Sequence, residues 1–478
     1  MNARKTVLLI ALALVVANAV PAIARETPRH LDALSLGELH IAVPTPASFT
    51  LPNGIRVYLF ENHELPLVAL TAQMPMDHRF LPLAERMAFR TMAKLWREGG
   101  AGAFSPEAVD ERVAALGMEF VAEAGGGRGQ VNALLMKADL DAGAPLWRDL
   151  CLSPAFDAER LERAREQLLK DFQGINDNPD WLAESWFDRL LAGPGTTDWH
   201  VTTRADIEAV SREAIQRLYQ GFLRPEAIVI GVAGDMDLAE AHTRMAALFG
   251  DWVPAAGTAL PPAAPWQRHP QSGVYLLPGD FSQCHVRIGR PLPELTERDL
   301  DYPLVRLLDF GVGINRVYLR TRQEGLSYGT TTRLTADSHW GQFFGFGSTR
   351  PDGLLDLLRA IREEVAAIPE RPLDAGEITA SRTFLLGREL NAMETLSGMV
   401  NRRLGDLVCG RGEDAMARMV AGLQDADEAS LAAAAARWVD FGPAPVLLVV
   451  GAPEGGAEAL AGLGLGPVSV LEPVRFGD

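Results

Sequence analysis

Apolar residues in this chain gather into short runs of strand length, separated by turns and by longer amphipathic segments. Residues 54–74, "GIRVYLFENHELPLVALTAQM", hold two such runs on either side of a polar turn. "GVYLLPG" and "CHVRIGRPLP" (273–279, 284–293) form a second pair, and "AIVIGVAG" and "PVLLVVGA" (227–234, 445–452) are continuous apolar runs. Such runs, bounded by turn signals, predict strands, and the helical segments between them indicate an α+β fold in which helices cover a sheet.

The same order of segments occurs twice at a constant separation. "VYL" at position 57 recurs at position 274, which is 217 positions later. The same separation relates "FDAERL" at 156 to "LDAGEI" at 373, and Gly234 to Gly451. Equal separations at three distant places predict an internal repeat of one structural unit.

The repeat predicts two tandem homologous domains, residues 25–252 and 274–478. The segment 253–273, "VPAAGTALPPAAPWQRHPQSG", is rich in proline and weakly patterned, and we expect it to link them. Each domain is expected to form a mainly antiparallel sheet covered by helices. The two copies are expected to face each other across a chamber.

The N-terminus has the features of a secretory signal peptide. Arg4 and Lys5 precede an apolar run, and Ala22 and Ala24 flank Ile23 at a small-residue cleavage site. We expect cleavage after Ala24, with residues 1–24 removed and the mature chain periplasmic or secreted. No later segment approaches the roughly 18 apolar residues of a membrane-spanning helix, so no membrane anchor is expected.

Charge and cysteine content exclude several classes of function. The formal net charge is −17, and it becomes −19 once Arg4 and Lys5 are removed, which argues against nucleic acid or an anionic membrane as a partner. Basic or neutral peptides remain possible partners. Cys151, Cys284 and Cys409 are too few for a disulfide framework or a cysteine metal site. We expect buried small side chains, and the sequence leaves one disulfide open.

Three motifs resemble the insulinase-like (pitrilysin or inverzincin) zinc metallopeptidases. "LPNGIRVYLFENHELPLVAL" at 51–70 resembles the opening strands of that family. "DNPDWLAES" at 177–185 and "EGLSYGTTTRL" at 324–334 resemble later landmarks, in the same order. The resemblance covers nearly the whole mature chain and implies tandem homologous α+β domains.

Active members of that family carry His-x-x-Glu-His on a helix and a further Glu some seventy residues later. Alignment on "EGG" at 98–100 places the three motif positions at Arg90, Ala93 and Lys94, and the distant carboxylate at Asp171. His-x-x-Glu-His occurs nowhere in the chain. Guanidinium and ammonium groups offer zinc no lone pair and Ala offers no base, so only Asp171 remains as a candidate ligand. We expect no cofactor here, and zinc only in a partner subunit.

The charged positions on this helix allow two interpretations. Arg90, Lys94 and Arg97 are expected to share one face of the helix, and this face can be solvated. Alternatively, Arg90 or Lys94 can pair with Asp171 where zinc would stand. This face is also suited to receive acidic peptide groups. The nearby "GGGRG" at 125–129 lacks the Lys-Ser or Lys-Thr of a phosphate loop and is interpreted as a hairpin.

The second copy contains a segment that resembles the place where family members project an Arg and a Tyr toward the substrate. In "NRVYLRTRQEGLSYG" the Tyr is Tyr328. The usual register places the Arg at Thr321, between Arg320 and Arg322, and we favour Arg322 over Arg320. Such a pair can hydrogen-bond the scissile carbonyl oxygen and stabilise its developing charge. The alternative is that Tyr328 packs in a strand and the arginines lie on a helix surface.

These features together predict a non-catalytic subunit of a periplasmic two-chain insulinase-type metallopeptidase. It would bind peptide and supply Tyr328 with Arg322 or Arg320 to a zinc-bearing homologous partner. The alternative is a peptide-binding or assembly scaffold without peptidase activity, which holds an extended chain by strand addition.

Overall fold

The central strands of the first sheet are buried on both faces. In β2 (Arg56–Glu61), Val57 and Leu59 belong to the largest apolar core, whereas Tyr58 and Phe60 belong to a second cluster. Successive side chains of a strand point to opposite faces, so each face of the sheet has its own covering layer. This explains why the sequence here is continuously apolar and does not alternate with polar residues.

The computed structural model describes residues 41–256, 260, 267–452 and 455–473. Residues Val43–Asp478 form one unit by their contacts, and the description below concerns that unit. The predicted signal peptide lies outside the described residues, as do 257–259 and 261–266 of the predicted linker, and the domain boundaries stay predictions. None of the described helices is long and apolar enough to cross a membrane.

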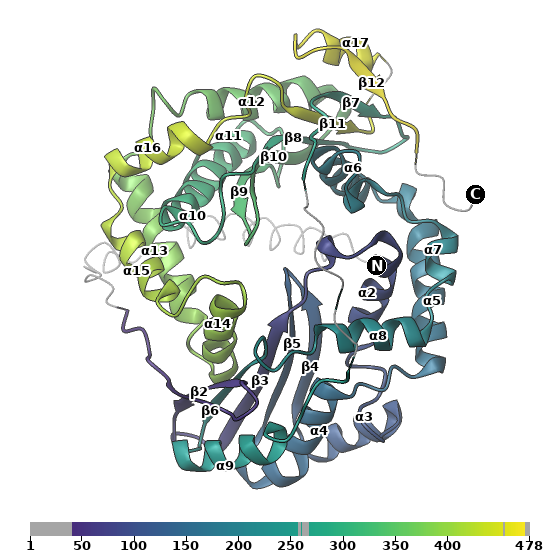
Figure 1. Ribbon diagram of the computed structural model, residues 1–478. Coiled ribbons are helices and arrows are strands. Elements are labelled where there is room, and N and C mark those ends of the chain that lie inside the picture. The colour runs from purple at the N-terminus through teal and green to yellow at the C-terminus, as the bar shows by residue number, and fades with distance from the viewer. Residues whose placement is uncertain (1–40, 257–259, 261–266, 453–454, 474–478) are drawn as a thin grey trace, which may run out of the picture. The chain divides into compact units, whose positions relative to one another are not determined.

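The first repeat contains a six-stranded sheet and helices that are inserted between its strands (Figure 1). In chain order its elements are β1 (Ala47–Thr50), β2, β3 (Leu67–Pro75), α2 (Leu83–Leu95), α3 (Pro106–Ala115), β4 (Glu119–Gly125), β5 (Arg128–Met136), α4 (Leu140–Leu152), α5 (Ala158–Gln173), α6 (Pro179–Ala192), α7 (Arg204–Glu208), α8 (Arg212–Phe222), β6 (Val229–Gly234) and α9 (Leu238–Phe249). Short 3₁₀ turns lie at His78–Phe80, Lys137–Asp139, Ile175–Asp177 and Thr197–Trp199.

The second repeat has the same plan, with a π-helical stretch at Gly311–Tyr318 and a 3₁₀ turn at Pro351–Gly353. Its elements are β7 (Gly273–Leu277), β8 (Cys284–Leu292), α10 (Tyr302–Phe310), α11 (Leu319–Gln323), β9 (Thr331–Ala336), β10 (Gly341–Thr349), α12 (Leu354–Ala366), α13 (Ala375–Asn391), α14 (Leu396–Val408), α15 (Ala415–Asp425), α16 (Glu428–Trp438), β11 (Val446–Val450), α17 (Gly456–Ala461) and β12 (Val468–Val470).

The two sheets have equivalent strand orders. They are β1-β2-β6-β3-β5-β4 and β12-β7-β11-β8-β10-β9. Strand β2 pairs in parallel with β6, as β7 does with β11. The next pair in each sheet, β6 with β3 and β11 with β8, is antiparallel. Only the edge strand differs, because β1 precedes the repeat and runs antiparallel to β2, whereas β12 follows it and runs parallel to β7. The predicted α+β fold with two mainly antiparallel sheets is confirmed.

The predicted repeat of 217 positions holds for helices as well as for strands. Strand β8 begins at Cys284 and β3 at Leu67, and helix α14 begins at Leu396 and α6 at Pro179, so each pair is separated by 217 positions. Asn178 caps α6 by accepting a hydrogen bond from the Trp181 N–H, and Thr395 caps α14 in the same manner. The same local signals therefore start the same helix in both copies.

These two equivalent helices are exchanged between the sheets. Val400 and Leu404 of α14, from the second repeat, pack on Tyr58, Val229 and Ala233 of the first sheet. Figure 1 shows α14 beside β2, β3 and β6. Gly231 lies at the centre of this contact, where an added Cβ would overlap Val400 Cγ1 and lie 3.1 Å from Leu404 Cδ1.

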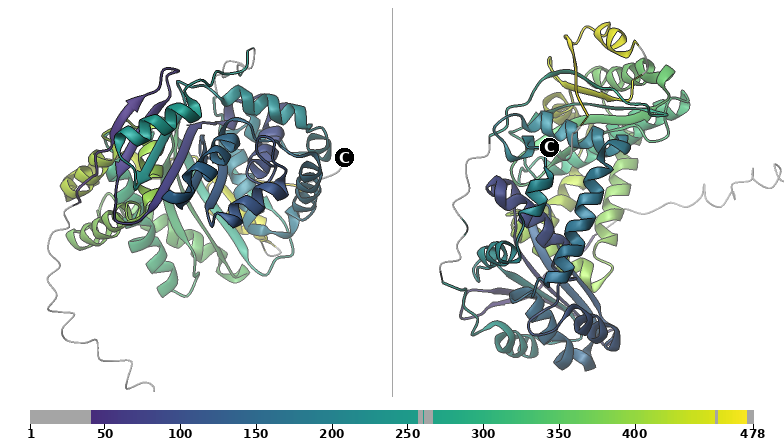
Figure 2. Two further views of the ribbon diagram at one scale, coloured as in Figure 1. Left: turned by 90° about the horizontal axis from the view of Figure 1, so that it is seen from below. Right: turned by 90° about the vertical axis from the view of Figure 1, so that its right-hand side faces the viewer.

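The reciprocal contact places α6 of the first repeat on the second sheet. Phe187 and Leu191 of α6 belong to the same core as Val446, Leu448 and Val450 of β11. The ring of Phe187 also lies 5.8 Å from the ring of Phe344 in β10. Figure 2 gives two further views of the sheets and the helices that cover them. Each sheet thus obtains one of its covering layers from the other repeat.

Replacing Gly231 by Ala should weaken this packing. Because Val400 is stiff and fully buried, the new methyl group is expected to lower the free energy of unfolding by about 1 to 3 kcal/mol. Chemical unfolding followed by circular dichroism measures this difference. Gly231→Ala should lower the free energy of unfolding by less when Val400 is also replaced by Ala, because the overlap of the new methyl group with Val400 is then removed.

Gly387→Ala is a matched control for this substitution. Gly387 lies within α13 and an added Cβ meets no atom within 4 Å. Its replacement should raise the free energy of unfolding by roughly 0.5 to 1 kcal/mol, because Ala is the better helix former. Equal behaviour of the two variants would contradict the close packing of α14 on the sheet.

Candidate functional site

A cavity of about 710 Å³ lies against α2 and α6 and is also bounded by Trp340 and Gln342 of the second repeat. Its wall combines apolar and charged side chains. Aromatic rings come from Phe89, Phe172, Trp181 and Trp340; cations come from Arg86, Arg90, Lys94, Arg189 and Arg268; carboxylates come from Glu184, Asp188, Asp198 and Asp206. A concave site with an apolar lining and a few charged groups is suited to hold a peptide segment.

Helix α2 brings the three degenerate zinc-motif positions to this cavity. Arg90, Ala93 and Lys94 all line it, because the opposite face of α2 is buried in the core. Arg97 does not continue their stripe as expected. The helix ends at Leu95, and the Arg97 guanidinium instead donates to Asp110 and to a strand carbonyl.

The ion pair with Asp171, one of the two interpretations left open by the sequence, is present and is made by Lys94. Lys94 Nζ lies 3.2 Å from Asp171 Oδ2, and the Gln167 amide donates to the other carboxylate oxygen at 2.7 Å. The Gln167 hydrogen bond and then Lys94 hold the pKa of Asp171 below its usual value. Both side chains of the pair are about two-fifths exposed. An ion pair this exposed contributes at most about 1 kcal/mol to the free energy of unfolding. It lies where α2 contacts α5 but stabilises that contact little.

Arg90 lies beside this pair and packs on an aromatic ring. Its guanidinium carbon lies 5.3 Å from the centroid of the Phe172 ring, and burial lowers the pKa of Arg90. The side chains at positions 90, 93, 94 and 171 therefore do not fit a zinc ion, because two are cations and one is a methyl group. Across the described residues no group of three or more His, Cys, Asp or Glu has a geometry suited to a metal.

A group of acidic side chains on α6 was not predicted from the sequence. Asp188 is exposed to the cavity, and partial desolvation of its carboxyl group by the cavity wall raises its pKa to about 6. Arg287 and Arg268 oppose that shift. Glu184, one turn earlier, lies 3.6 Å from Arg287. The spacing of Glu184 and Asp188 on one helical face was the available signal, but the sequence does not tell that this face borders a cavity.

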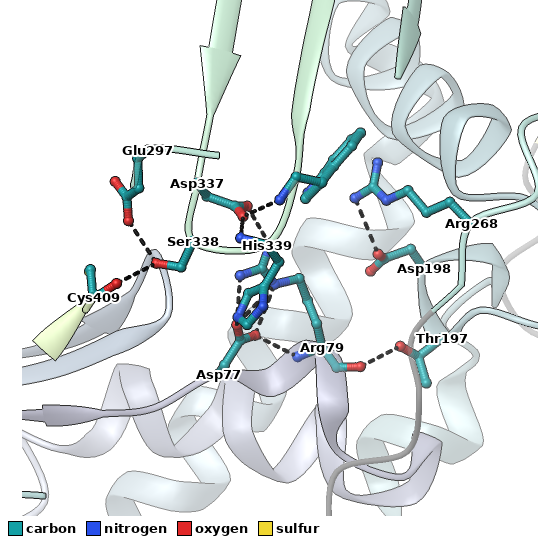
Figure 3. A network of polar contacts seen from close by, with 11 residues as sticks. Asp77, Arg79, Thr197, Asp198, Arg268, Glu297, Asp337, Ser338, His339 and Cys409 are labelled. Carbon is teal, nitrogen blue, oxygen red and sulfur yellow. Dashed lines mark hydrogen bonds and ion pairs between the residues drawn. The ribbon is translucent and has the colours of Figure 1, made fainter. Parts of the chain in front are cut away.

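A polar network joins the turn between β9 and β10 to the first repeat (Figure 3). Arg79 forms ion pairs with Asp77, at 2.6 Å, and with Asp337 of the turn. His339 Nε2 lies 3.3 Å from Asp77 Oδ2. The Asp337 side chain in turn accepts hydrogen bonds from the N–H groups of His339 and Trp340. The network therefore holds Trp340 in its place on the cavity wall.

The other side of the same turn is held within the second repeat. The Ser338 hydroxyl lies 2.7 Å from a Glu297 carboxylate oxygen and 3.2 Å from the Cys409 carbonyl oxygen (Figure 3). In the first repeat the corresponding turn is the predicted "GGGRG" hairpin, in which Gly126 and Gly127 adopt positive φ. The Gly127 carbonyl accepts the Met76 N–H at 2.9 Å. The segment around Asp77 thus contacts both turns.

Tyr328 and the two candidate arginines lie away from the cavity lining. The Tyr328 side chain is 86% exposed, and the Arg322 guanidinium lies 6.0 Å from its ring. Arg322 also donates to the Tyr318 hydroxyl. Arg320 points elsewhere, because it forms ion pairs with Glu363 and with two further carboxylates on α11 and α12. Thr321 is buried between them. The geometry brings Arg322, and not Arg320, to Tyr328.

The three cysteines are buried and unpaired. The expectation of buried small side chains is confirmed, and the alternative of one disulfide is not.

The family model matches the end of the first repeat and most of the second. The family model described as the peptidase M16 inactive domain matches residues 209–385, a stretch that includes Arg322 and Tyr328 but not α2 or Asp171. This match confirms the expected resemblance of the chain to the insulinase-like M16 peptidases. The match to an inactive domain supports a non-catalytic member of that family.

Known proteins resemble this chain at low sequence identity. An uncharacterized zinc protease of Streptomyces coelicolor is 23% identical over 277 residues, which cover 56% of this chain and 60% of the relative. The chain thus spans less than two thirds of that relative. The peptidase M16 inactive domain from Pseudomonas fluorescens is 18% identical with a TM-score of 0.74, covering 86% of this chain and 99% of that one. The periplasmic protease PqqL from Escherichia coli is 12% identical with a TM-score of 0.74, covering 91% and 52%.

Rebuilding the family's motif tests the register assigned to α2. Arg90→His, Ala93→Glu, Lys94→His and Asp171→Glu together should give about one zinc per chain, because positions 90 and 94 lie one turn apart and 171 already contacts 94. Elemental analysis of purified protein measures the zinc content. Arg90→His with Lys94→His alone should hydrolyse no peptide, because the general base is still missing. Tight zinc in the wild-type chain that Asp171→Ala removes would contradict the register.

The raised pKa of Asp188 predicts a pH dependence of stability. A carboxyl group whose pKa is higher in the fold than in the unfolded chain stabilises the fold fully below about pH 4, and this contribution is lost as the pH rises through about 6. Asp188→Asn should therefore melt at a higher temperature than wild type at pH 7.5 and at the same temperature at pH 4. The gain at pH 7.5 should be about 1 kcal/mol, because solvent in the cavity screens the charge.

Asp425→Asn, on the exposed surface of α15, controls for the loss of one negative charge. If Asp188→Asn melts below wild type at pH 7.5, the carboxylate is stabilised by its arginine neighbours and the predicted sign is wrong.

Proposed function

We propose that this chain is the zinc-free subunit of a periplasmic two-chain insulinase-type metallopeptidase. It binds peptide and presents Tyr328 with Arg322 to substrate held by a zinc-bearing homologue. The observation that carries this proposal is the contrast between two places in the chain. The zinc-motif positions hold Arg90, Ala93 and Lys94, whereas a phenol and a guanidinium lie together on the outer surface.

The exposure of Tyr328 supports action on another chain. A tyrosine with 86% of its surface in water buries little apolar area and contributes little to the fold. Arg322 has no ion-pair partner among the described residues, in contrast to Arg320 with its three carboxylates. A phenol and an unpaired guanidinium are suited to stabilise negative charge on a carbonyl oxygen. Neither lines this chain's own cavity, so the substrate they reach would be held elsewhere.

Two relatives support the protease activity and the periplasmic location in this proposal. One is described as a zinc protease and one as a periplasmic protease. A periplasmic location for this chain agrees with the predicted cleavage after Ala24. A zinc-bearing partner of the same family is the simplest source of the ligands that positions 90 and 94 do not supply.

The cavity itself favours a second candidate function, a peptide-binding scaffold without a peptidase partner. Its volume of about 710 Å³, its aromatic lining and its charged groups suit a short peptide segment whether or not a protease is present. The two candidates differ in whether Tyr328 has a chemical role.

Tyr328→Phe tests the proposed role. Loss of one donor to a developing oxyanion should lower the turnover of the two-chain complex by roughly tenfold to a thousandfold, with assembly unchanged. The measurement is peptide hydrolysis by the reconstituted pair, with complex formation followed by size-exclusion chromatography.

The two neighbouring arginines provide a matched comparison. Arg322→Ala should lower turnover in the same way, whereas Arg320→Ala should leave it near wild type and lower the melting temperature, because it breaks the ion pairs between α11 and α12. If Tyr328→Phe and Arg322→Ala both assemble and hydrolyse at the wild-type rate, the action on the partner's substrate is refuted and the scaffold function is favoured.

A further inference from the structure

Arg189, near the end of α6, is a buried cation without a carboxylate partner. It is 7% exposed and it lines the cavity. No Asp or Glu among the described residues lies within ion-pair distance of it, and its Nε is buried without an acceptor. Buried polar groups are nearly always hydrogen-bonded, and buried charges are nearly always paired, so this side chain needs an explanation.

The nearest stabilising contact of Arg189 is aromatic. Its guanidinium carbon lies 4.6 Å from the centroid of the Trp186 ring. The indole Nε1 of Trp186 is itself buried without an acceptor, so two unsatisfied donors belong to neighbouring side chains. A cation–π contact offsets only part of the cost of removing a guanidinium from water, and burial lowers the pKa of Arg189 accordingly.

Two other cations of the cavity wall are paired with carboxylates of the chain. Arg86 lies 2.6 Å from Asp198, and Lys94 lies 3.2 Å from Asp171. Arg189 is more deeply buried than either of them and has no such partner. The difference indicates that the acceptor for Arg189 comes from outside the chain.

The helix surface around Arg189 suits an elongated ligand. Trp181, Ser185 and Arg189 follow one another at four-residue intervals along α6, and all three line the cavity. Residues four apart lie on one stripe of a helix, so an apolar ring, a hydroxyl and a guanidinium stand in a row. Asp188 precedes Arg189 and projects about 100° away from it around the helix axis.

We propose that Arg189 binds a carboxylate of the peptide held in the cavity. A guanidinium offers two parallel N–H donors that match the two oxygens of a carboxylate, and the Ser185 hydroxyl lies one turn away along the same stripe. The carboxylate is either the C-terminus of the peptide or an Asp or Glu side chain. This inference rests on the proposed peptide-binding function.

Calorimetric titration with three unlabelled peptides tests it. All are N-acetylated decapeptides of alanine, leucine and glutamine: one ends in a free carboxylate, one ends in an amide, and one ends in an amide and carries a single internal glutamate. The wild-type chain should bind one of the two acidic peptides at least about tenfold more tightly than the neutral one, which corresponds to about 1.4 kcal/mol. Which acidic peptide is preferred identifies the source of the carboxylate.

Substitutions of Arg189 should remove this preference. Arg189→Met should bind all three peptides equally and melt no lower than wild type, because an unpaired buried cation is lost. Arg189→Lys keeps the charge without the planar fork and should retain only part of the preference. Arg112→Met is the matched control: Arg112 stacks on Phe104 at 4.0 Å outside the cavity lining, and its loss should leave the preference unchanged.

Several outcomes would overturn the inference. Equal binding of the three peptides by wild type, or a preference that persists in Arg189→Met, excludes a carboxylate at Arg189 while leaving peptide binding intact. Marked destabilisation of both Arg189 variants would make this side chain structural. Binding of inorganic phosphate as tight as that of the acidic peptide, and lost in Arg189→Met, would make the site one for free anions. Failure of wild type to bind any peptide would refute the proposed peptide-binding function itself.

Discussion

The reciprocal exchange of α6 and α14 is the constraint on which the rest of this structure depends. Each sheet has an apolar face that is covered by a helix of the other repeat, and strand residues such as Val229 and Val446 are almost fully buried as a result. Neither repeat completes its own core, because exposing such a face to water is unfavourable in proportion to its area. The two sheets are therefore parts of one cooperative unit, although the chain is built from two copies of one motif.

The exchange also builds the cavity. Helix α6 is held in place by Phe187 and its apolar neighbours on the second sheet, and its remaining surface carries Asp188 and Arg189 to the cavity wall. Hydrophobic packing of one face of α6 thus positions the charged groups on its other face. Neither Asp188 nor Arg189 forms a strong ion pair within the described part of the chain. A site on a packed helix holds its geometry better than a site on a loop. The turn that contains Trp340 is fixed by a different means, the ion pairs of Arg79.

The sequence predicts the helices and strands of this fold better than it predicts which of them pack together. The strands and the repeat of 217 positions followed from local patterns. The contact of Lys94 with Asp171 was one of two interpretations that alignment on the insulinase-like motif left open. The helix exchange did not follow, because the apolar period of α6 shows that one face is buried but not which sheet buries it. Asp188 and Arg189 were missed for the same reason. Arg97 was placed wrongly because the end of α2 at Leu95, two residues earlier, has no strong sequence signal.

Arg320 and Arg322 lie two positions apart in the sequence but have different surroundings in the fold. Arg320 is held by three carboxylates and Arg322 by none, although only Thr321 stands between them. In the first repeat, Lys94 pairs with Asp171 where α2 contacts α5, and no metal ligand is needed for this contact. A lysine satisfies the charge of that carboxylate but cannot polarise water or a carbonyl as a divalent ion does. The contact between the two helices is thus kept without metal ligands, and the exposed Tyr328 with its neighbour Arg322 are the groups to which the proposed function assigns a chemical role.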